Sequence, residues 1–155
     1  MERHFTSTVY IFHEEKILLL FHKKHNKWMA PGGHVEPNET PPETARREAL
    51  EETGVEVEFI TQENIWFHYP HAQSIERPYH VLLETLPAIG QMPAHQHIDF
   101  FYVARPKATH TPKEPHEVRW FTLQEVQQLI PHQEIFPDAQ KTIEHLFNSQ
   151  LVAHE

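Results

Sequence analysis

One stretch of the chain, residues 33 to 55, decides the fold: GHVEPNETPPETARREALEETGV. It follows the pattern G-x5-E-x7-R-E-U-x-E-E-x-G-U, in which U is an aliphatic residue. The fixed positions are all filled in register, by Gly33, Glu39, Arg47, Glu48, Glu51, Glu52 and Gly54. Val55 fits the second aliphatic position, whereas Ala49 is a small residue at the first. A match this complete sets the stretch apart from an ordinary acidic segment.

The middle of this stretch predicts a helix from Pro41 to Thr53. Thr40 and Glu43 have the spacing of a capping box, in which side chain and backbone groups satisfy each other at the start of a helix. Pro41 falls at the first helical position, where a missing N–H does no harm. Gly54 follows the last good helix former and can take the left-handed conformation that ends a helix.

On such a helix Glu48, Glu51 and Glu52 lie on one side, because they are related by steps of three and four. Like charges in these positions repel each other, so stability alone would not select them. A solvated acidic face is the plain alternative. The complete pattern instead favours a site for Mg²⁺ or Mn²⁺, which prefer oxygen ligands. Arg47 stands four residues after Glu43 and four before Glu51, so it is expected to pair with both and to order the carboxylates.

This pattern resembles the Nudix box of the Nudix hydrolases (MutT-like proteins). The resemblance implies an α/β fold in which a mixed sheet is sandwiched between helices. It also implies metal-dependent hydrolysis of a pyrophosphate bond in a nucleoside diphosphate linked to another group X, by in-line attack of a metal-activated water. Glu48 and Glu52 would then be the primary metal ligands and Glu51 an additional one. The carbonyl of Gly32 would also contact a metal, while Gly33 lets the backbone approach a phosphate closely.

A general base outside the box is sought in the segment 113–120, KEPHEVRW. In some relatives a glutamate on a later loop serves as the base or completes the metal site. Glu114 stands six residues before Trp120 and matches that glutamate by spacing, so it is counted with the catalytic and metal-binding residues. Glu117 is the competitor, and both could be ordinary loop acids.

Substrate contacts are expected on a later strand. His95, His97 and Asp99 alternate along the sequence, so in a strand they point to one face. Two imidazoles and a carboxylate there could bind a metal or a phosphate, or could form a hydrogen-bonded sheet edge. Arg77 is a further phosphate candidate, as are the neighbouring lysines 23 and 24.

Aromatic residues after the box are open to two interpretations. Trp66, Phe67 and Tyr69 lie where relatives place residues that sandwich a nucleobase, but for any one of them a place in the core is the more ordinary role. Pro70 lies close to the position of a proline in ADP-ribose pyrophosphatases of the family. The sequence therefore leaves nucleoside triphosphates and ADP-ribose-like compounds both open as substrates.

Composition sets the remaining limits. The 155 residues suit a single domain over the whole chain, and the absence of cysteine excludes disulfides and thiol chemistry. A net charge of −9 argues against binding to a DNA or RNA polymer. We expect a cytoplasmic protein without a membrane segment, and a homodimer if the apolar stretch 65–69 is exposed. The alternative to an enzyme is a catalytically silent domain that senses nucleotides or binds a partner.

Periodicity and turn residues predict the other elements. Strands are expected over 6–12, 16–22, 56–67, 79–86, 98–104 and 118–121, with helices over 123–130 and 138–151. Loops are expected over 23–27, 87–93 and 105–115, where proline and polar residues gather.

Overall fold

The computed structural model describes residues 1–60 and 62–152. Its main element is an eight-stranded mixed sheet with the order β10-β2-β1-β9-β5, to which β3, β4 and β8 are added beside β2, β1 and β9. The strands of this sheet are β1 (Arg3–His13), β2 (Lys16–His22), β3 (Lys27–Met29), β4 (Gly32–His34), β5 (Val55–Phe59), β8 (His80–Leu86), β9 (His95–Thr109) and β10 (Glu117–Thr122). The helices are α1 (Pro41–Thr53), α2 (Leu123–Gln128) and α3 (Pro137–Phe147).

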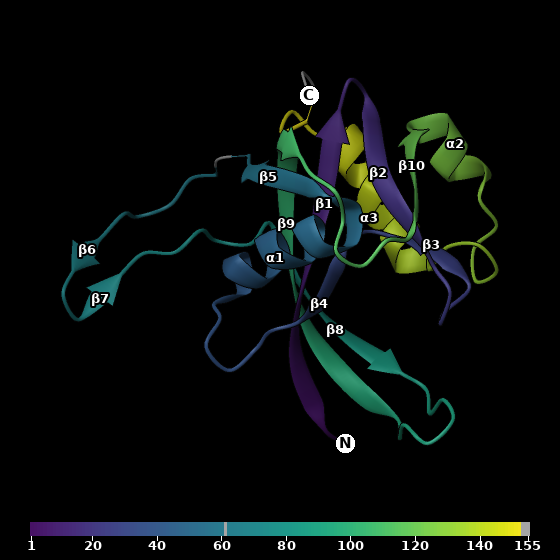
Figure 1. Ribbon diagram of the computed structural model, residues 1–155, viewed down its shortest axis with the longest axis horizontal. Coiled ribbons are helices and arrows are strands. Elements are labelled where there is room, and N and C mark those ends of the chain that lie inside the picture. The colour runs from purple at the N-terminus through teal and green to yellow at the C-terminus, as the bar shows by residue number, and fades with distance from the viewer. Residues whose placement is uncertain (61, 153–155) are drawn as a thin grey trace.

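Helices cover both faces of the sheet, as the resemblance implies. In Figure 1, α1 crosses one face while α3 lies behind the other. Alternation along β1 explains this arrangement, because successive side chains of a strand point to opposite faces. Val9 and Ile11 pack with Ala45 and Ala49 of α1 in one core. The predicted α/β/α architecture is confirmed.

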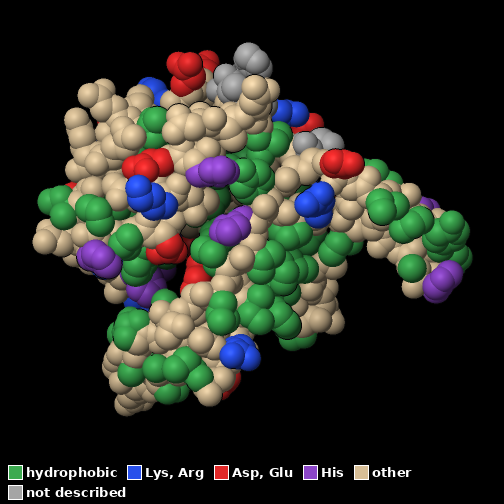
Figure 2. Space-filling view, turned by 180° about the vertical axis from the view of Figure 1, so that it is seen from behind, with side chains coloured by type: hydrophobic (Ala, Val, Ile, Leu, Met, Phe, Trp, Pro, Cys, Tyr) green, Lys and Arg blue, Asp and Glu red, His purple; other side chains and the backbone are tan. Residues whose placement is uncertain are grey.

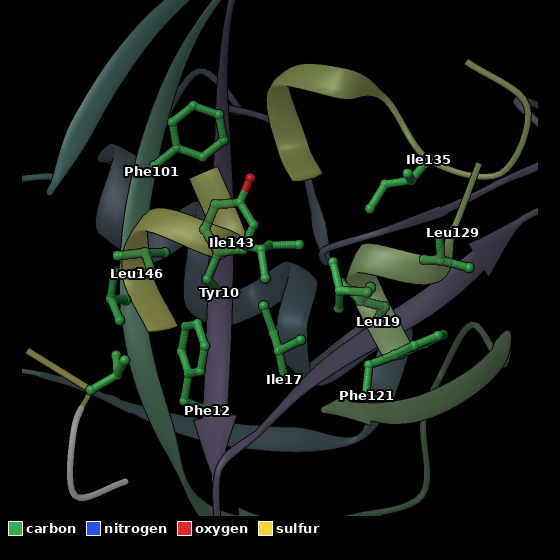
Figure 3. Close-up of a cluster of buried hydrophobic side chains, with 13 residues drawn as sticks. Tyr10, Phe12, Ile17, Leu19, Phe101, Phe121, Leu129, Ile135, Ile143 and Leu146 are labelled. Carbon is green, nitrogen blue, oxygen red and sulfur yellow. The ribbon is translucent and has the colours of Figure 1, made fainter. Parts of the chain in front are cut away.

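The second core lies between the sheet and the helices α2 and α3. Tyr10 and Phe12 point into it from β1, and Figure 3 shows them facing Ile143 and Leu146 of α3. Phe12 meets Phe147 edge to face, with ring centroids 5.1 Å apart. These side chains are nearly or completely buried, so the two ends of the chain are held together by apolar packing.

The two strands predicted at the start of the chain and both ends of helix α1 are confirmed. The hairpin between β1 and β2 turns at Glu14 and Glu15, which both have positive φ angles, 50° and 62°. Such a two-residue turn suits the twist of paired strands. The carboxylate of Glu43 accepts hydrogen bonds from the N–H and the hydroxyl of Thr40. Gly54 ends α1 with φ 75° and donates its N–H to the carbonyl of Leu50.

Two predicted boundaries are wrong. The strand expected over 56–67 ends at Phe59. Residues 62–67 instead belong to a projecting arm that carries the small hairpin of β6 (His68–Tyr69) and β7 (Ala72–Gln73) (Figure 1). The loop expected over 105–115 begins only after Thr109. Strand β9 passes through Pro106, where the register against β5 shifts between Glu56 and Val57. A bulge of this kind accommodates a proline that cannot donate to the ladder.

The other predicted elements differ from their expected bounds by a few residues, whereas β3 and β4 were not predicted. Helix α2 is shorter than predicted, and α3 begins one residue earlier and ends at Phe147. Within the described residues, no helix is long and apolar enough to cross a membrane.

Candidate functional site

Three glutamates of α1 lie at the centre of the candidate site. Their side chains are largely covered, with 14% of Glu48, 21% of Glu51 and 8% of Glu52 exposed. The pKa of Glu52 is raised to about 8, mainly by burial and also by the nearby acids Glu48, Glu114 and Glu51, against the lowering effect of the Gly32 N–H. Burial also raises the pKa of Glu48. This is the electrostatic pattern of a carboxylate cluster that needs a cation.

The Gly32-Gly33 pair brings backbone up to these carboxylates. The N–H of Gly32 donates to Oε1 of Glu52 over 3.0 Å. A Cβ atom on Gly33 would lie 2.5 Å from Oε1 of Glu48, and one on Gly32 would lie 2.5 Å from the carbonyl oxygen of Ser7. The glycines form strand β4 on β1 and neither has a positive φ. Their role is therefore to permit close approach and not to provide a left-handed backbone conformation.

Arg47 orders the acids through one of its two predicted partners and through Glu39, which was not predicted. Its guanidinium binds both oxygens of Glu39, and its Nη1 lies 2.8 Å from Glu48 Oε1 and 3.2 Å from Glu51 Oε2. The predicted pair with Glu51 is present. The predicted pair with Glu43 is not among the contacts of the described residues, because that carboxylate is held by Thr40.

The later loop places Glu114 beside α1. Its backbone N–H donates to the carbonyl of Glu51 over 2.7 Å, and its charge contributes to raising the pKa of both Glu48 and Glu52. Glu117 instead lies in β10 opposite Phe21 of β2. His116, between them, brings Nε2 to 3.8 Å from Glu52 Oε2.

A cavity of about 520 Å³ adjoins these acids. Glu52, Gly32 and Gly33 form part of its lining, and His95, His97 and Asp99 enter it from β9. Figure 2 shows acidic and histidine side chains gathered around a hollow in the body of the molecule. Apolar side chains complete its walls, among them Leu20, Met29, Phe101 and Phe136. The cavity combines an acidic, polar part with apolar surface, as nucleotide-sized ligands require.

The β9 residues share one face, as predicted, and Asp99 is fixed there. Both of its oxygens accept from the hydroxyl of Thr8, over 3.1 and 2.9 Å. Burial, together with the adjacent Asp99, raises the pKa of Glu84 to about 9. Glu84 and Thr8 line the cavity, yet neither was singled out from the sequence. The available signal was the alternation of β8, which places Glu84 on the same face as Leu82 and Leu86.

Other predicted residues lie elsewhere. Arg77 donates to the carbonyl of Glu63 and lines a separate hollow of about 390 Å³ together with Arg46 and Trp66. Trp66, Phe67 and Tyr69 are between 53% and 59% exposed, so the core role expected for them is wrong. They lie on the projecting arm and are not part of the cavity lining. Of the two lysines considered, Lys24 lines the cavity.

Comparisons with known proteins agree with this fold. The NUDIX domain model matches residues 2–146. A hydrolase of the NUDIX family from Clostridium perfringens is similar in structure, with a TM-score of 0.68, 24% identity and coverage of 96% of this chain and 98% of that one. A NUDIX hydrolase from Nitrosomonas europaea gives a TM-score of 0.64 at 17% identity, covering 94% and 88% of the two chains. At these identities the likeness concerns the fold.

A relative in sequence is the RNA pyrophosphohydrolase of Bartonella henselae, 43% identical over 54 residues. The match covers 34% of this chain and 31% of that protein, so it spans less than a third of the relative's length. The family is therefore assigned from the NUDIX domain model, which matches almost the whole chain, and not from this short match. The chain belongs to the Nudix hydrolase family, whose members act on pyrophosphate bonds.

Proposed function

We propose that this protein hydrolyses a pyrophosphate bond of a nucleotide-type substrate with the help of Mg²⁺ or Mn²⁺. The observation that carries the proposal is Glu52, a buried carboxylate of high pKa that is fixed by the Gly32 N–H at the wall of the cavity. A buried charge of this kind is costly without a cation beside it. Its position beside two further carboxylates provides the oxygen ligands that a hard divalent cation prefers.

Some residues of the site would bind the cation, and Arg47 positions them. Glu48, Glu51 and Glu52, with the Gly32 carbonyl, would hold the cation, and Glu114 would complete the site or take the proton from the attacking water. When bound, the cation would neutralise phosphate oxygens and lower the pKa of a water molecule. Arg47 keeps Glu48 and Glu51 in place through its Nη1 contacts.

The cavity supports a nucleotide as the substrate class. Its apolar walls, which include Phe101 and Phe136, suit a base or a sugar, while the acidic part would bind the phosphates through the cation. His95, His97 and Asp99 lie where they could contact the rest of the substrate. Gly33 would contact the phosphates through its backbone, since it has no side chain to separate the strand from Glu48. Nucleoside triphosphates and ADP-ribose-like compounds both satisfy this description.

The direct test is phosphate or pyrophosphate release from a panel of nucleotides, with Mg²⁺ or Mn²⁺. The panel should contain nucleoside triphosphates, ADP-ribose, nucleotide sugars, dinucleoside polyphosphates and, because of the Bartonella relative, RNA with a 5′-triphosphate. Glu52→Gln is expected to lower kcat by more than about 100-fold, since even residues behind a metal ligand are worth 10–100-fold. Glu56→Gln, at a half-buried acid of β5 outside the cavity lining, is the matched control.

Unfolding cannot account for the expected loss in Glu52→Gln. The substitution removes a buried charge from a group whose pKa is already raised to about 8, so the metal-free variant should melt no lower than the wild type. Absence of turnover on the whole panel, with nucleotide still bound, would favour the alternative of a nucleotide sensor. Equal activity of the wild type and Glu52→Gln would remove the proposed metal site.

We also propose that the arm supports a homodimer. Ile65, Trp66, Phe67 and Tyr69 expose between 53% and 70% of their surfaces along one projecting segment, and Figure 2 shows the apolar side chains gathered there. Apolar surface of this extent favours burial against another chain. Sedimentation velocity of the wild type and of Trp66→Glu tests the proposal, because a dimer should dissociate in the variant. A wild-type monomer at high protein concentration would exclude it.

A further inference from the structure

The register of the sheet gathers four histidines outside the acidic helix. His4 of β1 and His97 of β9 are direct partners in the parallel pairing of these strands, so their side chains leave the sheet on the same face. His95 lies two residues before His97 and shares that face. His34 of β4 pairs beside β1, opposite Thr6. Three strands that are distant in sequence therefore present imidazoles to one place.

The nitrogen atoms of these rings are already spaced like metal ligands. One nitrogen each from His4, His34 and His97 lie within 4.8 Å of one another, and no other group of three potential ligands meets this criterion among the described residues. Nδ1 of His4 lies 3.3 Å from Nε2 of His34, and Nε2 of His95 lies 3.2 Å from Nε2 of His97. Tetrahedral ligands about 2.0–2.1 Å from Zn²⁺ stand about 3.3–3.4 Å apart.

Hydrogen bonds from outside the cluster orient the rings of His4 and His95. The carboxylate of Glu2 lies 2.6 Å from Nε2 of His4, and the carbonyl of Pro93 lies 3.0 Å from Nδ1 of His95. Because these oxygens only accept, both outer nitrogens carry the proton. The lone pairs then lie on Nδ1 of His4 and Nε2 of His95, the nitrogens that face His34 and His97. Metal-binding histidines are held in this way, with the second nitrogen donating to a carboxylate or a carbonyl.

We infer that His4, His34 and His97 form a binding site for a late transition-metal ion such as Zn²⁺, with His95 or water as the fourth ligand. Imidazole suits Zn²⁺, Ni²⁺ and Cu²⁺, whereas the acidic helix offers oxygen ligands suited to Mg²⁺. His34 and His97 also line the cavity that contains Glu52. An ion held there would add positive charge to the same cavity. The inference does not depend on hydrolysis, since metal binding can be measured without a substrate.

Zinc binding to the full chain tests this site. Protein without an affinity tag is stripped of metal and titrated with Zn²⁺ against a coloured chelator, in excess Mg²⁺ to fill the oxygen site. The wild type should bind one ion at the histidines, and Co²⁺ in its place should give the visible absorption of a tetrahedral nitrogen site. His97→Ala and His34→Ala should each weaken binding by more than about 100-fold, the upper value for residues that only support a ligand.

Two controls locate the ion. His71→Ala removes an exposed histidine of the arm, and Glu52→Gln alters the acidic helix; neither should change Zn²⁺ affinity. If His97→Ala fails to fold, His34→Ala carries the test, because its exposed side chain contributes little to the core. Absence of Zn²⁺ binding by the wild type would overturn the inference. So would unchanged binding in the His34 variant, or binding that is lost only in Glu52→Gln.

Discussion

The guanidinium of Arg47 binds both oxygens of the Glu39 carboxylate, with Nε 2.6 Å from Oε2 and Nη2 3.0 Å from Oε1. Glu39 belongs to the loop before α1, and it also accepts from the hydroxyl of Thr44 over 2.9 Å. The same guanidinium contacts Glu48 through Nη1. One arginine thus joins the loop, the helix and the candidate metal ligands, which explains why the box contains a fixed acid as far back as residue 39.

Arg47→Lys should damage both stability and turnover. Lysine keeps the charge but cannot make the two parallel bonds to Glu39 while also contacting Glu48. We expect a loss of about 1.5–3 kcal/mol in the free energy of unfolding, as for hydrogen bonds to charged groups, and a lower kcat. Urea unfolding and steady-state kinetics measure the two effects. Arg46→Lys is the control, because Arg46 instead pairs with Glu76; an equal loss of kcat there would contradict the positioning role.

The same ion pair predicts a dependence of stability on pH. The hydrogen bond from Arg47 is the main reason why the pKa of Glu39 falls to about 2 from its ordinary value of 4.5. A lowered pKa stabilises the folded state above the unfolded-state pKa, and this contribution is lost as pH falls from about 4.5 towards 2. The wild type should therefore unfold at higher urea than Glu39→Gln near neutral pH, and the difference should shrink in acid.

Urea midpoints of the two proteins, measured side by side from about pH 7 to about pH 3, give this difference directly. Comparing two proteins at each pH removes the contribution of the other carboxylates, which titrate in both. A difference that stays constant, or that grows in acid, would show that Glu39 is not stabilised by Arg47 in the way the distances indicate.

The sequence predicts an element well when the residues that fix its bounds lie close together in the chain. The bounds of α1 follow from Thr40, Pro41 and Gly54, which act within one turn of the helix. The arm could not be separated from β5 in this way, since the apolar residues 65–67 look like the continuation of a strand, and only the topology shows that they are not part of the eight-stranded sheet. Strand β9 likewise continues past Pro106 because β5 lies beside it.

In the candidate site, too, the residues close together in sequence could be predicted and those brought together by strand pairing could not. The acids of the helix are visible as a pattern because they lie within one turn and a half of each other. Glu84 meets Asp99 only through the pairing of β8 with β9, and His4 meets His97 only through the pairing of β1 with β9. Periodicity shows which face a side chain takes within its own strand. It does not show which strand will be the neighbour, so contacts of this kind appear only in the folded chain.

The two glycines before α1 should respond differently to a methyl group. In Gly32→Ala the new Cβ would meet the backbone oxygen of Ser7 at 2.5 Å, and a strand cannot yield easily. We expect a loss of about 1–3 kcal/mol in the free energy of unfolding, as for other overpacked sites. In Gly33→Ala the Cβ would meet Oε1 of Glu48, also at 2.5 Å. The end of a side chain can move, so this variant should stay closer to wild-type stability.

Movement of Glu48 should instead appear in the kinetics of Gly33→Ala. Displacing a positioned group by about 1 Å can lower a rate by about 100-fold, so kcat should fall clearly while the urea midpoint changes little. The two variants control for each other, because each adds one methyl group to the same strand. Equal stability losses with no kinetic difference would mean that Gly33 does not make room for Glu48.

Glu114 and Glu117 can be separated by a pair of matched substitutions. The loop holds Glu114 next to α1 through its N–H bond to the Glu51 carbonyl, and its charge acts on Glu48 and Glu52, whereas Glu117 is paired with β2. Glu114→Gln keeps the shape and the backbone bond but removes the charge. If Glu114 accepts a proton in the reaction, kcat should fall by about 10²–10⁴-fold with unchanged stability, while Glu117→Gln stays near the wild type. The reverse result would transfer the role to Glu117, and two active variants would place the base among the glutamates of α1.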